Sequence, residues 1–95
     1  MRDYELYLVI DAEAEEDAVS TIVDTMTELI SVGGEVGKVD YKGKRRLAYP
    51  LNKTAESQDI VLSFSASPQN LTEMERILKL DENVLRYLLV RTGEE

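Results

Sequence analysis

The densest group of side chains able to bind a charged ligand is a basic run in the middle of the chain. Residues 36–53 contain six Lys or Arg against one acid, Asp40, whereas the 95-residue chain as a whole carries a net charge of −8. A local excess of cations makes a directional field that attracts polyanions, so the run is a candidate nucleic-acid footprint. A lysine-rich strand at a sheet edge, which deters aggregation, would look the same. The charge pattern alone leaves both interpretations open.

Catalytic chemistry has few side chains to draw on. The chain has no His and no Cys, which removes Cys/His zinc sites, thiol nucleophiles and His-based acid–base relays. Five acids in residues 11–17 form the only other dense group of titratable side chains. Carboxylates at the start of a helix favour the helix dipole, and this explains the cluster more simply than a metal or acid–base site does. We expect a protein that is not an enzyme and has no metal or cofactor.

The spacing of apolar residues predicts the elements that position these groups. Alternation indicates strands, three- and four-residue spacing indicates helices, and Gly or Pro marks the breaks. Gly33-Gly34 ends the first helix, Gly43 interrupts a long β segment, and Ser67-Pro68 opens the second helix. The predicted elements are strand 3–10, helix 14–32, β segment 35–53, turn 54–57, strand 58–66, helix 68–80 and strand 84–91.

The order β-α-β-β-α-β predicts an α+β, ferredoxin-like fold. In it, a four-stranded antiparallel sheet carries two helices on one face. Pro50 has no amide hydrogen to donate, which places the second strand at a sheet edge. Residues 1–92 form one domain in this prediction, and residues 93–95 form a short tail. No apolar run is long enough to cross a membrane, and the first residues do not resemble a signal peptide.

The sheet face away from the helices is expected to be partly apolar. If Leu62 and its neighbours at period two face the helices, Tyr7, Val9 and Val61 point the other way, and one or more of Leu88 and Val90 are expected to join them. Exposed apolar area of this extent suggests a protein partner or stacked bases. The tyrosines beside the basic run, Tyr41 and Tyr49, could stack on bases, but we expect them to pack within the sheet.

Four segments together resemble the ribosomal protein S6 family of the bacterial small subunit. They are the opening residues 2–6 (RDYEL), the Gly33-Gly34 turn, the run 43–50 (GKRRLAYP) and residues 84–87 (VLRY). The similarity extends from residue 1 to about residue 92, and the run 43–50 is its most specific part. One departure is that Gln58-Asp59 stands where family members often have a Gly–aromatic pair. The acidic tail of some members is reduced to Glu94-Glu95.

The resemblance implies a structural, non-catalytic protein of the cytoplasmic ribosome. The family binds the central domain of small-subunit ribosomal RNA as a heterodimer with ribosomal protein S18. Residues matching the family's basic positions, and therefore expected to bind RNA or the protein partner, are Arg2, Lys44, Arg45, Arg46 and Arg86. The motif does not assign them between the two ligands. A net charge of −8 favours RNA binding with the help of a basic partner.

Other proteins of this fold offer alternatives. An RNA-recognition motif would carry its aromatic signature on the third strand, which here reads IVLSFSA. A phosphatase-like enzyme needs a phosphate-binding loop, whereas the first loop is strongly acidic. A regulatory ligand-binding or protein-interaction module of the same fold remains open, and thermal shift with amino acids and nucleotides would reveal it.

Overall fold

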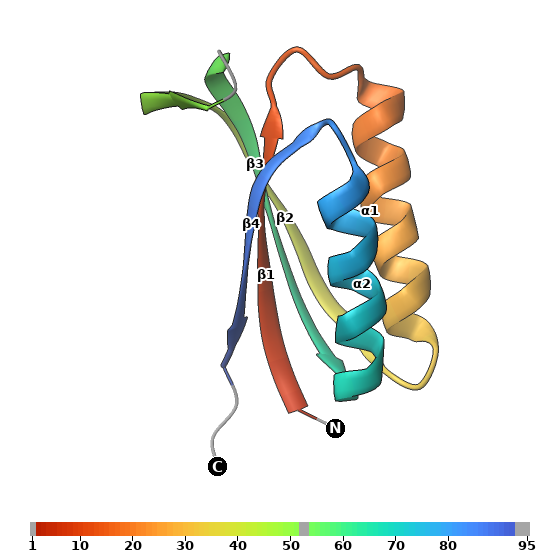
Figure 1. Cartoon of the computed structure of the whole chain (residues 1–95). Coiled ribbons are helices and arrows are strands. Elements are labelled where there is room, and N and C mark those ends of the chain that lie inside the picture. The colour runs from red at the N-terminus through yellow and green to blue at the C-terminus, as the bar shows by residue number, and fades with distance from the viewer. Residues whose placement is uncertain (1, 52–53, 93–95) are drawn as a thin grey trace.

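A computed structural model describes residues 2–51 and 54–92 of the chain. Six elements follow one another in the predicted order, and the two helices lie side by side on one face of the sheet (Figure 1). The predictions for Lys53 and for the tail 93–95, and for the side chain of Tyr49, lie outside the residues described. The elements are β1 (Arg2–Asp11), α1 (Glu16–Ser31), β2 (Glu35–Leu51), β3 (Thr54–Ala66), α2 (Pro68–Leu80) and β4 (Val84–Arg91).

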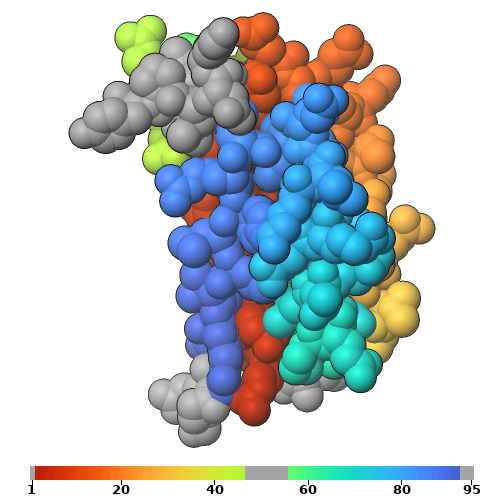
Figure 2. All heavy atoms as spheres, viewed as in Figure 1, coloured from red at the N-terminus to blue at the C-terminus, as the bar shows by residue number. Residues whose placement is uncertain are grey.

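The sheet confirms the ferredoxin-like prediction. Its strand order is β2-β3-β1-β4, and each neighbouring pair is antiparallel. β2 is therefore an edge strand, as the proline indicated. The space-filling view shows β4 (blue) beside α2 (cyan), with only small parts of β1 (red) visible between them (Figure 2). The strand order makes β1 and β3 the two central strands of the sheet.

The core lies between the sheet and the helices, where the predicted parity of the strands is confirmed. Alternate residues of the two central strands are almost fully buried, and Leu62 is 0% exposed. One face of each helix closes this layer. The buried cluster includes Leu6, Leu8, Ile10, Ile22, Val23, Met26, Ile30, Ile60, Leu62, Phe64, Met74 and Leu78.

The ends of the first helix correct one prediction and add a contact. α1 begins at Glu16 rather than residue 14, so only Glu16 and Asp17 of the acid cluster lie in its first turn. The Asp11 carboxylate instead accepts the Glu13 amide hydrogen in the loop before the helix. At the other end, the Asn70 side chain of α2 donates to two carbonyl oxygens there, Leu29 O and Val32 O. This contact ties the two helices together.

The hairpin of β2 and β3 is longer than the sequence predicted. Residues 54–57, expected as a turn, belong to β3, and Leu51 already pairs with Thr54. Gly43 adopts a φ of 88°, and the register shifts between Tyr41 and Gly43, so the predicted bulge is present. The far end of this hairpin curls away from the helices (Figure 1). Among the described residues, neither helix has the length and apolar character of a membrane-spanning segment.

Candidate functional site

The sheet face opposite the helices is here termed the open face. It carries the apolar residues predicted to point outward and two of the five predicted site residues, Arg45 and Arg86. Directly paired residues of antiparallel strands point to the same face. Asp59 pairs with Gly43 on one side and Val9 on the other, and Val9 pairs with Arg86, so one row of the open face crosses all four strands. Val9 is nevertheless only 5% exposed. The centre of the open face therefore exposes less apolar surface than predicted.

A buried carboxylate organises the centre of the open face. The Asp59 side chain is 3% exposed, and the Arg45 Nε atom lies 3.0 Å from Asp59 Oδ2. The Tyr7 hydroxyl donates to the same oxygen at 2.9 Å, and the Ser57 hydroxyl donates to Oδ1 at 2.9 Å. Two hydrogen bonds and one ion pair thus satisfy the carboxylate, which offsets the cost of its burial. The hydrogen bond from Tyr7, aided by burial and by the Asp59 charge, raises the pKa of the Tyr7 phenol.

Arg45 and Arg86 line the same hollow of the open face, although they come from opposite edges of the sheet. The hollow has a volume of about 240 Å³, and Tyr7, Val9 and Leu88 line it together with the two arginines. Arg86 has no ion-pair partner within the described part of the chain. The Arg45 side chain is 55% exposed, although its Nε atom lies against Asp59. The hollow therefore combines apolar surface with two cations.

The open face as a whole carries more carboxylates than cations. Lys42 Nζ lies 2.9 Å from Asp40 Oδ2, and this hydrogen-bonded pair lowers the pKa of Asp40 and raises that of Lys42. Strand pairing places six carboxylates and three cations on this face among the described residues, and Lys42 joins them through its ion pair with Asp40, so the face has no excess of positive charge. The carboxylates are Asp3, Glu5, Asp11, Glu35, Asp40 and Asp59, and the cations placed by pairing are Lys38, Arg45 and Arg86.

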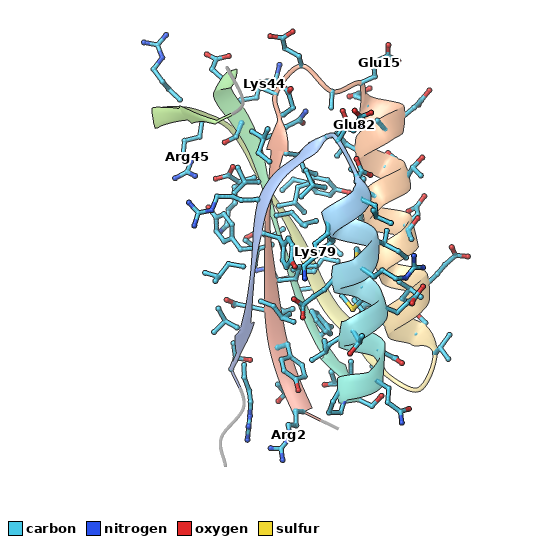
Figure 3. All side chains as sticks on the ribbon, in the orientation of Figure 1. Arg2, Glu15, Lys44, Arg45, Lys79 and Glu82 are labelled. Atoms are coloured by element: carbon cyan, nitrogen blue, oxygen red, sulfur yellow. The ribbon has the colours of Figure 1, made fainter. Side chains whose placement is uncertain are left out.

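The structure separates the five site residues that the sequence grouped. Lys44 and Arg46 pair with Gln58 and Glu56, so they point to the helix side of the hairpin, whereas Arg45 points to the open face. All three are exposed. Their backbones remain paired with β3 in the hairpin. Figure 3 shows Arg2 at the opposite end of the sheet from Lys44 and Arg45.

Two tyrosine predictions have different outcomes. Tyr41 is 60% exposed, so the expectation that it packs within the sheet is wrong. Its register position opposite Ile60 places it on the helix side of the edge strand, beyond the area that the helices cover. Tyr7 was predicted to face outward and does so, but as a donor to Asp59 rather than as a free ring.

Asp59 was not predicted from the sequence as a residue that organises this face. One signal was available: an acid occupies an open-face position at period two from Val61, directly before the apolar run of β3. Its partners Tyr7 and Arg45 come from two other strands, so no local pattern connects them. No group of three or more acidic side chains in residues 2–51 and 54–92 is placed to hold a metal ion.

The fold and this face define a class: small α+β proteins with a ferredoxin-like sheet whose open face is charged and carries no metal-binding group among the described residues. The family model for ribosomal protein S6 matches residues 3–91. Small ribosomal subunit protein bS6 of Moorella thermoacetica is 40% identical over 96 residues, covering 100% of this chain and 98% of the relative. The bS6 protein of Beutenbergia cavernae is 44% identical over 92 residues, 96% of each chain.

A solved structure agrees with these relatives. The crystal structure of 30S ribosomal protein S6 from Thermotoga maritima superimposes with a TM-score of 0.87 at 27% identity, covering 96% of this chain and 87% of that one. The chain belongs to the ribosomal protein S6 family. This confirms the resemblance that its N-terminal segment, basic run and last strand indicated.

Proposed function

We propose that this protein is a structural constituent of the small ribosomal subunit in the cytoplasm. In this proposal it binds the central domain of small-subunit ribosomal RNA together with ribosomal protein S18, and it catalyses no reaction. Family membership over residues 3–91 is the observation that carries the proposal. Residues 1–92 would act as the binding domain, with residues 93–95 as a short tail.

The basic hairpin supports RNA contact by this protein. Lys44, Arg45 and Arg46 are consecutive, exposed and close to the end of the β2–β3 hairpin, which curls away from the helices (Figures 1 and 3). Lys and Arg at such a position can reach phosphates without bringing the acidic helix surface close to the RNA. Phosphate contacts supply affinity without reading the base sequence.

The charge of the remainder of the chain supports a basic protein partner. A net charge of −8 repels RNA at long range, so binding by the isolated chain is expected to be weak. A basic partner that covers part of this surface removes the repulsion and gains affinity from complementary charge. S18, the partner implied by the family, fits this requirement.

A filter-binding series at several salt concentrations tests the RNA role. The preformed complex with S18 is compared with one in which Lys44, Arg45 and Arg46 are all Ala, and the control replaces Lys79 of α2 with Ala. Each true phosphate contact contributes about 0.7–0.9 to the slope of log K against log salt, so the triple variant should bind more weakly and with a flatter slope. An unchanged slope refutes the RNA role of the run.

Calorimetric titration of the two purified proteins tests the partnership. We expect the isolated chain to be a folded monomer that binds S18, with an affinity that falls as salt rises. Absence of heat and of a sedimentation change at low salt would show that the partner is wrong. Thermal shift with amino acids and nucleotides, in which no ligand is expected to act, addresses the regulatory alternative.

A further inference from the structure

The three consecutive basic residues of the hairpin lie on two faces of the sheet, and only one of them contacts the buried Asp59. Arg45 turns to the open face, where Asp59 holds its Nε atom at 3.0 Å. The adjacent Lys44 and Arg46 have register positions on the other face of the hairpin. Three consecutive cations therefore cannot serve one flat ligand in the same way.

The Arg45–Asp59 contact fixes where the free part of the guanidinium lies. Side-chain exposure is 55% for Arg45 and 3% for Asp59, so one end of the pair is anchored and the other faces solvent. Arg carries its N–H donors in a rigid planar fork, so engaging Nε orients the two terminal amino groups. Arg45 lines the hollow that Arg86 lines from the opposite sheet edge.

The hollow suits a single anionic side chain better than a nucleic-acid backbone. Its surface is formed in part by Val9, Leu88 and Tyr7, which an aliphatic stem could contact, and its volume of about 240 Å³ leaves room for one side chain. Leu88, which is 57% exposed, and Val90, which is 40% exposed, continue the apolar surface along β4. Two arginines at such a hollow match the planar oxygens of a carboxylate.

The surrounding charge argues against phosphates at this place. Asp59, Asp40 and Glu5 lie on the same face, and with Asp3 and Glu35 they outnumber its four cations. A chain of phosphates crossing this face would meet these carboxylates within roughly one Debye length, about 8–10 Å. One carboxylate seated between two arginines meets much less repulsion.

We propose that Asp59 is a positioning residue that holds Arg45 beside Arg86, and that the two arginines together receive one carboxylate of the protein partner docked on the open face. The proposal rests on the proposed function in that the partner is S18. It divides the basic residues: Arg45 and Arg86 bind the partner, and Lys44 and Arg46 are left for RNA.

A double-mutant cycle with S18 binding tests the positioning role. Asp59→Asn, Arg45→Gln and Arg86→Gln should each weaken binding by about tenfold or more, the size expected when a desolvated charge pair is broken. Because Asp59 acts through Arg45, the double variant Asp59→Asn/Arg45→Gln should bind no more weakly than Arg45→Gln alone. Additive losses would overturn the positioning role.

Two matched variants separate positioning from simple loss of structure. Ser57→Ala removes another donor to Asp59 but leaves the Arg45 contact and lies outside the lining of the hollow, so it should lower stability and leave S18 affinity within about twofold. Asp24→Asn makes the same charge change on an exposed position of α1 and should leave both unchanged. If Ser57→Ala weakens S18 binding as much as Asp59→Asn does, the carboxylate is merely structural and the proposal fails.

Measurements on the isolated protein keep this proposal separate from that of the S18 partnership. The NMR signals of the Arg45 and Arg86 side chains are followed during titration with sodium acetate, and with sodium chloride at equal ionic strength. Acetate should shift both signals saturably, and Asp59→Asn should abolish the Arg45 response. That result would support the carboxylate seat even if S18 did not bind. A response no larger than that to chloride would overturn the seat.

RNA binding by the preformed complex decides between carboxylate and phosphate at the hollow. Arg45→Gln and Arg86→Gln, assayed at protein concentrations that saturate S18, should leave the salt slope of RNA binding unchanged. Lys44→Ala/Arg46→Ala should flatten it, by about 0.7–0.9 for each phosphate that the variant no longer binds. A flatter slope for Arg45→Gln or Arg86→Gln would assign the hollow to phosphate and refute the proposal.

Discussion

Leu62 offers the sharpest test of how the sheet is oriented. It lies on the central strand β3, opposite Leu6 of β1 and Val39 of β2, and its side chain is 0% exposed. Leu62→Ala removes three carbons, worth about 2.4 kcal/mol at about 0.8 kcal/mol per buried methylene group. The cavity left between the sheet and the helices adds to this, so the free energy of unfolding should fall by about 2.5–5 kcal/mol.

Leu88→Ala is the matched control because it makes the same chemical change on the open face. Leu88 is 57% exposed, so its truncation should change stability by no more than about 0.5 kcal/mol. Urea unfolding followed by circular dichroism gives both values, and thermal unfolding should shift by about 4–8 °C per kcal/mol for a chain of this size. A loss below about 0.5 kcal/mol for Leu62→Ala, or a larger loss for Leu88→Ala, would refute the assignment of the two faces.

Three further variants test particular contacts. Gly34→Ala would place its Cβ against the carbonyl oxygens of Ser65 and Ile30. We expect the free energy of unfolding in urea to fall by about 1–3 kcal/mol, and a near-neutral result would exclude that close approach. Asn70→Ala removes the donor to Leu29 O and Val32 O. The free energy of unfolding should fall by about 1–2 kcal/mol, and hydrogen exchange at the end of α1 should become faster. Unchanged exchange would contradict the capping role. Tyr7→Phe tests how stability depends on pH. In the folded protein the hydrogen bond to Asp59 raises the pKa of the Tyr7 phenol above its usual value of 10.0. The stabilisation by this bond is therefore complete below pH 10.0 and is lost as pH rises through the pKa of the folded state. The stability difference between the wild type and Tyr7→Phe should therefore shrink above about pH 10 in unfolding titrations from pH 8 to 11, and a constant difference would count against the contact.

The sequence by itself determined the order of the elements, the faces of the strands and the family. Alternation in a strand is a local property, since each residue points opposite to its neighbour, and this fixed Leu62 inward and Tyr7 outward. Backbone chemistry was equally local: Gly43 allowed the positive φ of the bulge, and Pro50 indicated an edge strand. These features needed no knowledge of what lies across the sheet.

Only the tertiary structure decided how the charged residues are combined. The bulge at Gly43 and the hairpin register place Arg45 on the open face and its neighbours on the other, and a shift by one residue would reverse all three. Asp59 gains its role from Tyr7 and Arg45, which reach it from the strands on either side. The cap of α1 likewise comes from Asn70, on another helix. Such contacts join residues far apart in the chain, so they follow from strand register and packing rather than from any local pattern of residues.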